Sequence, residues 1–141
     1  MCGIAGFVDY RKNSSAAILK DCTDVLAHRG PDGSGYEFTQ LDHCQVGLGH
    51  RRLSIIDLSA AASQPMWYKH FAIIFNGEMY NYAEVKKELQ QLGHHFQTHS
   101  DTEVVLHAWE QWGAAMIHKF IGMFAFVIFD SQSQELFCFR D

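Results

Sequence analysis

Short apolar runs, each stopped by polar turn-forming residues, recur along the 141-residue chain. Three of them have strand length: Gly3 to Asp9, Phe71 to Phe75 and Met123 to Asp130. A continuous apolar run such as Gly3 to Asp9 suits a strand in a sheet that is covered on both faces, because a half-exposed strand alternates apolar and polar residues. The runs therefore predict a layered domain with buried strands.

Helical patterns separate these runs. Asn81 with Glu84, and Ser100 with Glu103, have the spacing of capping boxes ahead of apolar stripes. An earlier helix, capped within 13–15 and ended by Gly30 and Pro31, is predicted from a stripe made of Ile18, Leu19, Cys22, Val25 and Leu26. The remaining predicted elements are short strands at 36–39, 45–53 and 135–140, a short helix at 115–120, and loops at 30–35 and 57–68. This order is typical of an α+β or layered α/β domain and leaves the topology open.

Charge and cysteine content narrow the function classes. The formal net charge is −5 and the basic residues are scattered, so nothing predicts binding to nucleic acid or an anionic membrane. The four cysteines lack the spacing of a zinc ribbon or a disulfide scaffold. The N-terminal apolar stretch is too short for a signal peptide, and the longest later one, Ile121 to Phe129, is about half a membrane span. We expect a soluble cytoplasmic protein that acts on a small molecule or another protein.

Cys2 has the most unusual chemistry in the chain. Once Met1 is removed, Cys2 carries both a thiol and an α-amine whose reference pKa is about 7.7 to 8.0. The amine accepts a proton near neutral pH, so one residue supplies a nucleophile and its base. A Met-Cys start alone is usually incidental, and the other motifs decide between the two interpretations.

Further motifs accompany Cys2 along nearly the whole chain. They are CGIAGF at 2–7, HRGPDGSG at 28–35, GHRRLSIIDLS at 49–59, QPM at 64–66, FNGEMYNY at 75–82, SDTEVVL at 100–106, GMFAFVIFD at 122–130 and FRD at 139–141. In this order they resemble the class II, or N-terminal nucleophile, glutamine amidotransferases. The RGPD form favours the branch of the glutamine-hydrolysing asparagine synthetases.

The resemblance implies an α+β fold of the N-terminal nucleophile type, a four-layer α/β/β/α sandwich with mainly antiparallel sheets. Residues 1–141 would form a glutamine amidotransferase type 2 domain whose C-terminal part is absent, because the last motif normally continues into further strands. The synthetase domain of the family, which uses ATP and magnesium through an SGGxDS loop, is absent as well. A homodimer of the full-length protein is compatible with the resemblance.

The implied reaction is hydrolysis of glutamine to glutamate and ammonia through a glutamyl thioester on Cys2, a step that needs no cofactor. The ammonia would pass to a synthetase domain that amidates aspartate. Two alternatives stay open. Retention of Met1 would leave a catalytically silent, glutamine-binding or regulatory fragment, and related enzymes amidate other carboxylates. A purely structural docking domain is disfavoured by the intact set of motifs.

The resemblance also assigns the oxyanion donors. They are the side chain of Asn76 and the backbone N–H of Gly77, two fixed dipoles that can face a developing negative charge. Without the family pattern, Asn-Gly after an apolar run indicates a tight hairpin turn instead.

The remaining implied roles concern the two charged groups of the substrate. Arg52, at the start of a binding segment that continues through Leu53, Ser54, Ile55 and Ile56, is assigned to the α-carboxylate of glutamine. Arg51 is its rival, but strand alternation points neighbouring side chains in opposite directions. Glu78 and Asp101 are assigned to the α-ammonium. Without the family pattern, Glu78 would be interpreted as a solvated acid in a turn. Asp101 would be interpreted as an acid in the first turn of a helix, where the helix dipole favours it.

Two other patterns are not assigned to a ligand. The GPDGSG run at 30–35 lacks the spacing of a phosphate-binding loop, and the resemblance makes it a structural or glutamine-covering loop. His94, His95 and His99 lie near Asp101 but lack an HExxH motif and a nearby cysteine. We expect no metal site there.

Overall fold

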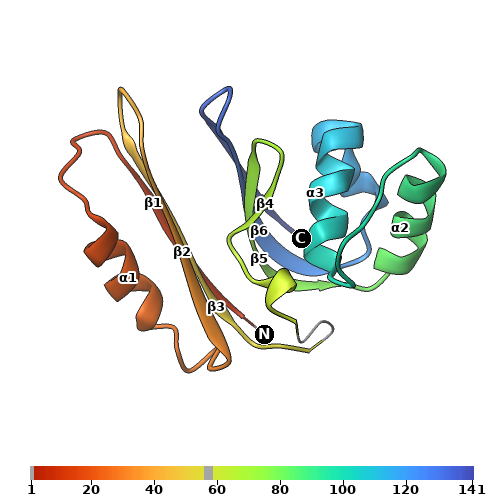
Figure 1. Ribbon diagram of the computed structural model, residues 1–141, viewed down its shortest axis with the longest axis horizontal. Helices are drawn as coiled ribbons and strands as arrows, with labels where there is room; N and C mark the ends of the chain where they lie inside the picture. Colours follow the sequence, from red (N-terminus) through yellow and green to blue (C-terminus); the bar gives the residue numbers. More distant parts are fainter. Residues whose placement is uncertain (1, 56–58) are drawn as a thin grey trace.

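The computed structural model describes residues 2–55 and 59–141. In this part of the chain two antiparallel sheets lie face to face, with helices on their outer sides (Figure 1). The elements in chain order are β1 (Gly3–Asp9), α1 (Ala16–Asp24), β2 (Gly33–Gln40), β3 (Gln45–Arg52), the 3-10 helix η1 (Ala60–Ala62), β4 (Met66–Tyr68), β5 (Phe71–Met79), α2 (Tyr82–Gln91), α3 (Asp101–Trp112), the 3-10 helix η2 (Gly113–Lys119), β6 (Gly122–Asp130) and β7 (Glu135–Arg140).

The layering follows from the order of strands and helices. The first sheet has the order β1-β3-β2 and the second the order β4-β5-β6-β7, and every neighbouring pair is antiparallel. Helix α1 covers the outer face of the first sheet, whereas α2 and α3 cover that of the second (Figure 1). The predicted four-layer α/β/β/α sandwich with antiparallel sheets is confirmed.

Strand β5 shows why some apolar runs are continuous. Phe71, Ile73 and Phe75 pack into the larger core, between the second sheet and α3. Ala72 and Ile74 point the other way, into the smaller core between the two sheets. Because a strand alternates its side chains, burial on both faces requires an apolar residue at every position.

Strand β1 departs from the predicted burial. The segment Gly3–Asp9 is a strand as predicted, but Val8 is 40% exposed and only Gly3 of the strand is fully buried. Its position explains the difference, since β1 is an edge strand that pairs with β3 alone.

The Asn76-Gly77 pair is not a hairpin turn and does not end the strand. Strand β5 continues through it to Met79, with Asn76 opposite Ala125 and Gly77 opposite Phe124 of β6. Gly77 has φ +153°, and a Cβ built on it would lie 2.2 Å from the carbonyl oxygen of Met123. Only glycine allows β6 to approach so closely.

The helix starts follow the predicted caps in part. Ser100 caps α3 by accepting a hydrogen bond from Thr102 N at 3.0 Å. Asn81 precedes α2 but makes no capping bond, because its side chain bonds Lys119 O and Ile121 N instead. The predicted capping box at this position is therefore wrong, although the helix is present.

Helix α1 is shorter than predicted and turned about its axis. It ends at Asp24, well before Gly30, and its buried residues are Leu19 and Thr23. Ile18 and Val25 of the predicted stripe are 45% and 74% exposed. Thr23 was not part of the predicted apolar stripe. Its hydroxyl is satisfied in the buried position because it donates to Leu19 O at 2.7 Å. No helix in the described residues is long and apolar enough to cross a membrane.

Candidate active site

One cavity opens where the ends of the two sheets meet, and most of the predicted site residues line it. The first sheet contributes Cys2 and the end of β3, and the second contributes the end of β5. The segment after β3 and the N-terminal turn of α3 complete the wall. The lining residues are Cys2, His50, Arg52, Leu53, Ser54, Ile55, Ala62, Gln64, Phe75, Gly77, Glu78, Ser100, Asp101 and Thr102. Ile56 of the predicted binding segment lies outside the described residues.

Cys2 is held at the end of the first sheet by contacts to both its side chain and its backbone. Its half-buried Sγ accepts a hydrogen bond from Leu53 N at 3.3 Å and lies 3.7 Å from Leu53 O. Arg29 Nε donates to the Cys2 carbonyl at 3.1 Å. These three contacts fix the position of Cys2 at the edge of the cavity.

The two neighbouring arginines point in opposite directions, as alternation predicts. Arg51 donates to Gly30 O at 3.2 Å and pairs with Asp24 at 3.3 Å, so it turns toward α1. Arg52 lines the cavity and donates through Nη1 to Ser59 O at 2.8 Å. Of the two guanidinium groups, the one at Arg52 can therefore meet an anion in the cavity.

The opposite wall is acidic. Asp101 is 7% exposed and accepts a hydrogen bond from Met79 N at 3.2 Å. Burial raises the pKa of the Asp101 carboxyl, hydrogen bonds from Met79 N and Thr102 N lower it, and the neighbouring Glu78 charge raises it further. A bound ammonium group would relieve both the desolvation and the repulsion between the two carboxylates.

The two predicted oxyanion donors are consecutive on β5 and line different hollows. Gly77 lines the cavity of Cys2. Asn76 lines a neighbouring hollow formed with Met123, Phe124, Ala125, Arg140 and Asp141. Its side-chain oxygen is buried and has no hydrogen-bond partner within the described residues. The predicted role of both donors stays a prediction.

His50 is a cavity residue that the sequence analysis did not single out. Its ring is 1% exposed, and burial lowers its pKa to about 4, so it is neutral at physiological pH. The ring approaches the backbone of Phe75, but neither nitrogen makes a hydrogen bond of normal geometry to the described part of the chain. Alternation along β3 could have found it, because His50 and Arg52 share one face of the strand.

Gln64 is the second residue that was missed, although it lies in the QPM motif. Its Oε1 accepts from Phe75 N at 2.6 Å and its Nε2 donates to Thr102 Oγ1 at 3.0 Å. The side chain therefore joins β5 to the first turn of α3 beside the cavity.

The GPDGSG segment supports the wall from outside. Asp32 Oδ2 accepts a hydrogen bond from Ser54 N at 2.8 Å, and Asp32 N donates to Arg52 O at 3.0 Å. These two bonds fix the path of the chain as it leaves β3. The second half of the segment, from Gly33, belongs to β2, so the predicted loop is shorter than expected.

Comparison with known proteins places the chain among relatives of similar architecture. Asparagine synthetase [glutamine-hydrolyzing] 3 of Bacillus subtilis is 40% identical over 147 aligned residues, which cover 100% of this chain and 23% of that protein. Amidase chry2 of Gibberella zeae is 37% identical over 100% of this chain and 22% of its own length. The chain thus spans about a quarter of the length of these curated relatives.

A solved structure and a family profile agree with these matches. The glutamine phosphoribosylpyrophosphate amidotransferase of B. subtilis, in complex with ADP and GMP, superposes with a TM-score of 0.67 at 21% identity. The superposition covers 92% of this chain and 35% of that one, and at this identity it establishes the shared fold. The family described as "glutamine amidotransferase domain" matches residues 1–141. The chain therefore belongs to the glutamine amidotransferase domain family.

Proposed function

We propose that this chain hydrolyses glutamine to glutamate and ammonia, with Cys2 as the nucleophile, and that it supplies ammonia to a glutamine-dependent asparagine synthetase. The observation that carries the proposal is the single cavity that contains a thiol, a guanidinium group and two carboxylates: Cys2, Arg52, Glu78 and Asp101. These are the groups needed to attack an amide and to hold an amino acid by both of its charged ends.

The reaction begins with removal of Met1, which frees the α-amine of Cys2. The amine accepts the thiol proton, and the thiolate adds to the side-chain amide carbon of glutamine. The tetrahedral intermediate then expels ammonia, which takes the proton from the amine, and a glutamyl thioester remains. Water, deprotonated by the same amine, cleaves the thioester and releases glutamate and the thiol.

Substrate recognition divides between the two sheets. Arg52 would pair with the α-carboxylate through its planar fork, and Asp101 with Glu78 would pair with the α-ammonium. Gly77 N–H would meet the oxyanion. The side-chain amide of Asn76, the neighbouring residue on β5, would be the second donor. Loss of one such donor typically costs about 3 to 4 kcal/mol of transition-state stabilisation.

The molecule that accepts the ammonia is a second, more specific part of the proposal. The B. subtilis relative, an asparagine synthetase, supports aspartate as the acceptor, whereas the G. zeae relative, an amidase, keeps another acceptor open. The synthetase step would require ATP and magnesium in a further domain. We also propose a reducing compartment such as the cytoplasm, because Cys2 must keep a free thiol.

The test of glutamine hydrolysis compares glutamate release by wild type and Cys2→Ala. We expect release to fall to the uncatalysed level, whereas Cys22→Ala, which alters an exposed cysteine on α1, should retain the wild-type rate. Equal rates for wild type and Cys2→Ala would exclude Cys2 as the nucleophile. Intact-mass analysis of the same samples reports Met1, since active protein that fully retains Met1 would overturn the role of the α-amine.

A further inference from the structure

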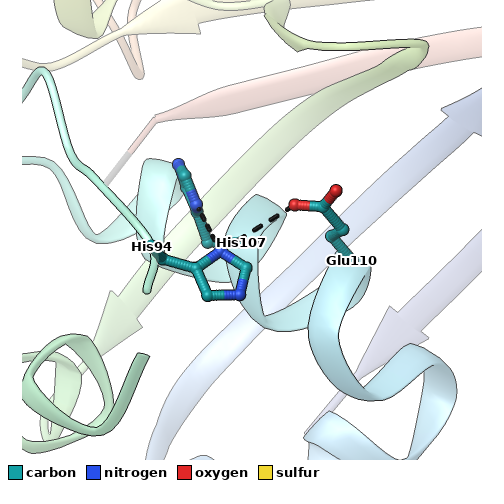
Figure 2. A group of neighbouring side chains, drawn as sticks. All are labelled: His94, His107 and Glu110. Carbon is teal, nitrogen blue, oxygen red and sulfur yellow. Dashed lines mark hydrogen bonds and ion pairs between the residues drawn. The ribbon is translucent and has the colours of Figure 1, made fainter. Parts of the chain in front are cut away.

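A cluster of metal-ligand side chains lies outside the cavity of Cys2, on the helical layer over the second sheet. His94 follows α2, while His107 and Glu110 lie one turn apart on α3, and Figure 2 shows the three side chains converging. His94 Nδ1 lies 2.9 Å from His107 Nδ1 and 3.8 Å from Glu110 Oε2. One ligand atom from each residue fits within a separation of 4.8 Å.

The cluster is held in place by its surroundings. The His107 ring is 1% exposed and stacks between Tyr68 and Phe96, with ring centroids at 4.1 and 4.4 Å. The His94 side chain is 9% exposed. Lys69 Nζ contacts Glu110 Oε1, which leaves Oε2 directed at His94. The donors are therefore preorganised and mostly shielded from water.

The contacts of His107 leave one of its ring nitrogens without a partner. Its Nδ1 lies 2.9 Å from His94 Nδ1, and His94 Nε2 lies 2.9 Å from Gln111 Oε1. His107 Nε2 is buried 3.8 Å from the Glu103 carboxylate and makes no hydrogen bond within the described residues. A buried ring nitrogen without a partner is unfavourable.

A cation bound between the two Nδ1 atoms would fix the tautomers of both rings. Both Nε2 atoms could then carry protons, one facing Gln111 and the other facing Glu103, as the outer partners of metal-bound histidines commonly do.

We propose that His94 Nδ1, His107 Nδ1 and Glu110 Oε2 bind a divalent transition-metal ion, with zinc as the best match. Two imidazole nitrogens and one carboxylate oxygen form a ligand set that zinc accepts, with water as the fourth ligand. Zinc–nitrogen bonds of about 2.0–2.1 Å in tetrahedral geometry place two nitrogens ~3.3 Å apart, so the rings need to separate only slightly. The positive charge of Lys69 would repel the ion, but its contact with Oε1 also holds the Glu110 carboxylate in place.

The site would act as a structural clip. The segment between α2 and α3 already docks on α3, because Glu103 accepts hydrogen bonds from Gln97 N at 2.8 Å and Thr98 N at 2.7 Å. A metal at His94 would fasten the beginning of the same segment, whose end carries the Ser100 cap and Asp101. The proposal does not depend on glutamine hydrolysis.

The test uses the full chain with Cys2→Ala, which removes the thiol of the proposed glutaminase site. Cobalt(II) is titrated, and we expect one equivalent with visible d–d bands and no thiolate charge-transfer band, displaced by zinc. His94→Gln and Glu110→Gln should each weaken binding at least tenfold, whereas His95→Gln, a change at the exposed neighbouring histidine, should not.

A second measurement keeps the test independent of folding defects in the variants. Zinc should raise the melting temperature of the Cys2→Ala and Cys2→Ala/His95→Gln chains and leave that of the His94→Gln chain unchanged. Absence of one-to-one binding would overturn the proposal. So would equal binding by the His94→Gln and His95→Gln chains, because the metal would then be held by other residues.

Discussion

Replacing Gln64 by Met removes two buried hydrogen bonds and keeps the side-chain volume nearly constant. Strand β4 pairs Met66 with Ile73, so extending the register by two positions would set residue 64 opposite Phe75. The side-chain oxygen of Gln64 takes the place of a strand carbonyl there, accepting from Phe75 N at 2.6 Å. Its amide nitrogen bonds the Thr102 hydroxyl at 3.0 Å. Gln64 is 8% exposed, so water cannot readily replace these partners.

The expected cost follows from the groups that are left unpaired. A buried N–H without a partner costs about 1–3 kcal/mol, and loss of an ordinary hydrogen bond about 1 kcal/mol more. Gln64→Met should therefore lower the free energy of unfolding by roughly 2–4 kcal/mol, a large fraction of the 5–15 kcal/mol typical of a domain. The apolar isostere separates this effect from loss of packing.

Urea denaturation measures the change, with the fitted slope as a check that both proteins unfold in the same way. The matched control is Gln90→Ala on the exposed face of α2, which should stay within about 0.5 kcal/mol of wild type. A Gln64→Met protein as stable as the control would refute the reasoning, because Phe75 N–H would then have found another acceptor.

Three further predictions follow from the cavity and its supports. Arg52→Ala should raise KM for glutamine roughly 10- to 100-fold through loss of a charge-assisted pair, whereas Arg51→Ala should lower stability and leave KM unchanged. Asp101 has a raised folded-state pKa, so it favours folding most below its ordinary value of 3.8, and this contribution is lost as pH rises through the folded-state pKa. The stability of wild type relative to Asp101→Asn should therefore decline over that range in a pH series of denaturation curves. Gly77→Ala should destabilise by more than about 2 kcal/mol, and Gly93→Ala by less, because both have positive φ but only Gly77 meets backbone within 4 Å.

Strand positions were the part of the fold most accessible from sequence. The runs at Phe71 and Met123 are apolar at successive positions because their strands are covered on both faces. This pattern therefore predicts that layers pack on both sides of the sheet. The same pattern at Gly3 predicted too much burial, since nothing local distinguishes an edge strand from a central one. Asn76-Gly77 was ambiguous for a similar reason. A close approach by β6 and a tight turn both require glycine, and only the partner strand decides between them.

The site was predictable where it depended on alternation and on motifs. Strand alternation predicted that only one of Arg51 and Arg52 faces the site, the family pattern selected Arg52, and alternation from Arg52 would have added His50. The placement of Asn76 and the linking role of Gln64 depend on tertiary contacts that spacing does not reveal. The metal cluster shows the same limit, because His94 is close to His107 only after α2 and α3 have packed together.

The cavity is assembled from two sheets whose strands do not pair with each other in the described part of the chain, with Cys2 at the end of the first sheet and Glu78 on the second. The thin apolar layer between them, formed by Val46, Leu48, Ala72, Ile74 and Phe129 with Cys44, is therefore a spacer as well as a core. Its thickness sets how far the Cys2 sulfur stands from the Glu78 carboxylate. Substitutions in this layer would therefore change the spacing of the groups in the proposed glutamine site without altering any of those groups.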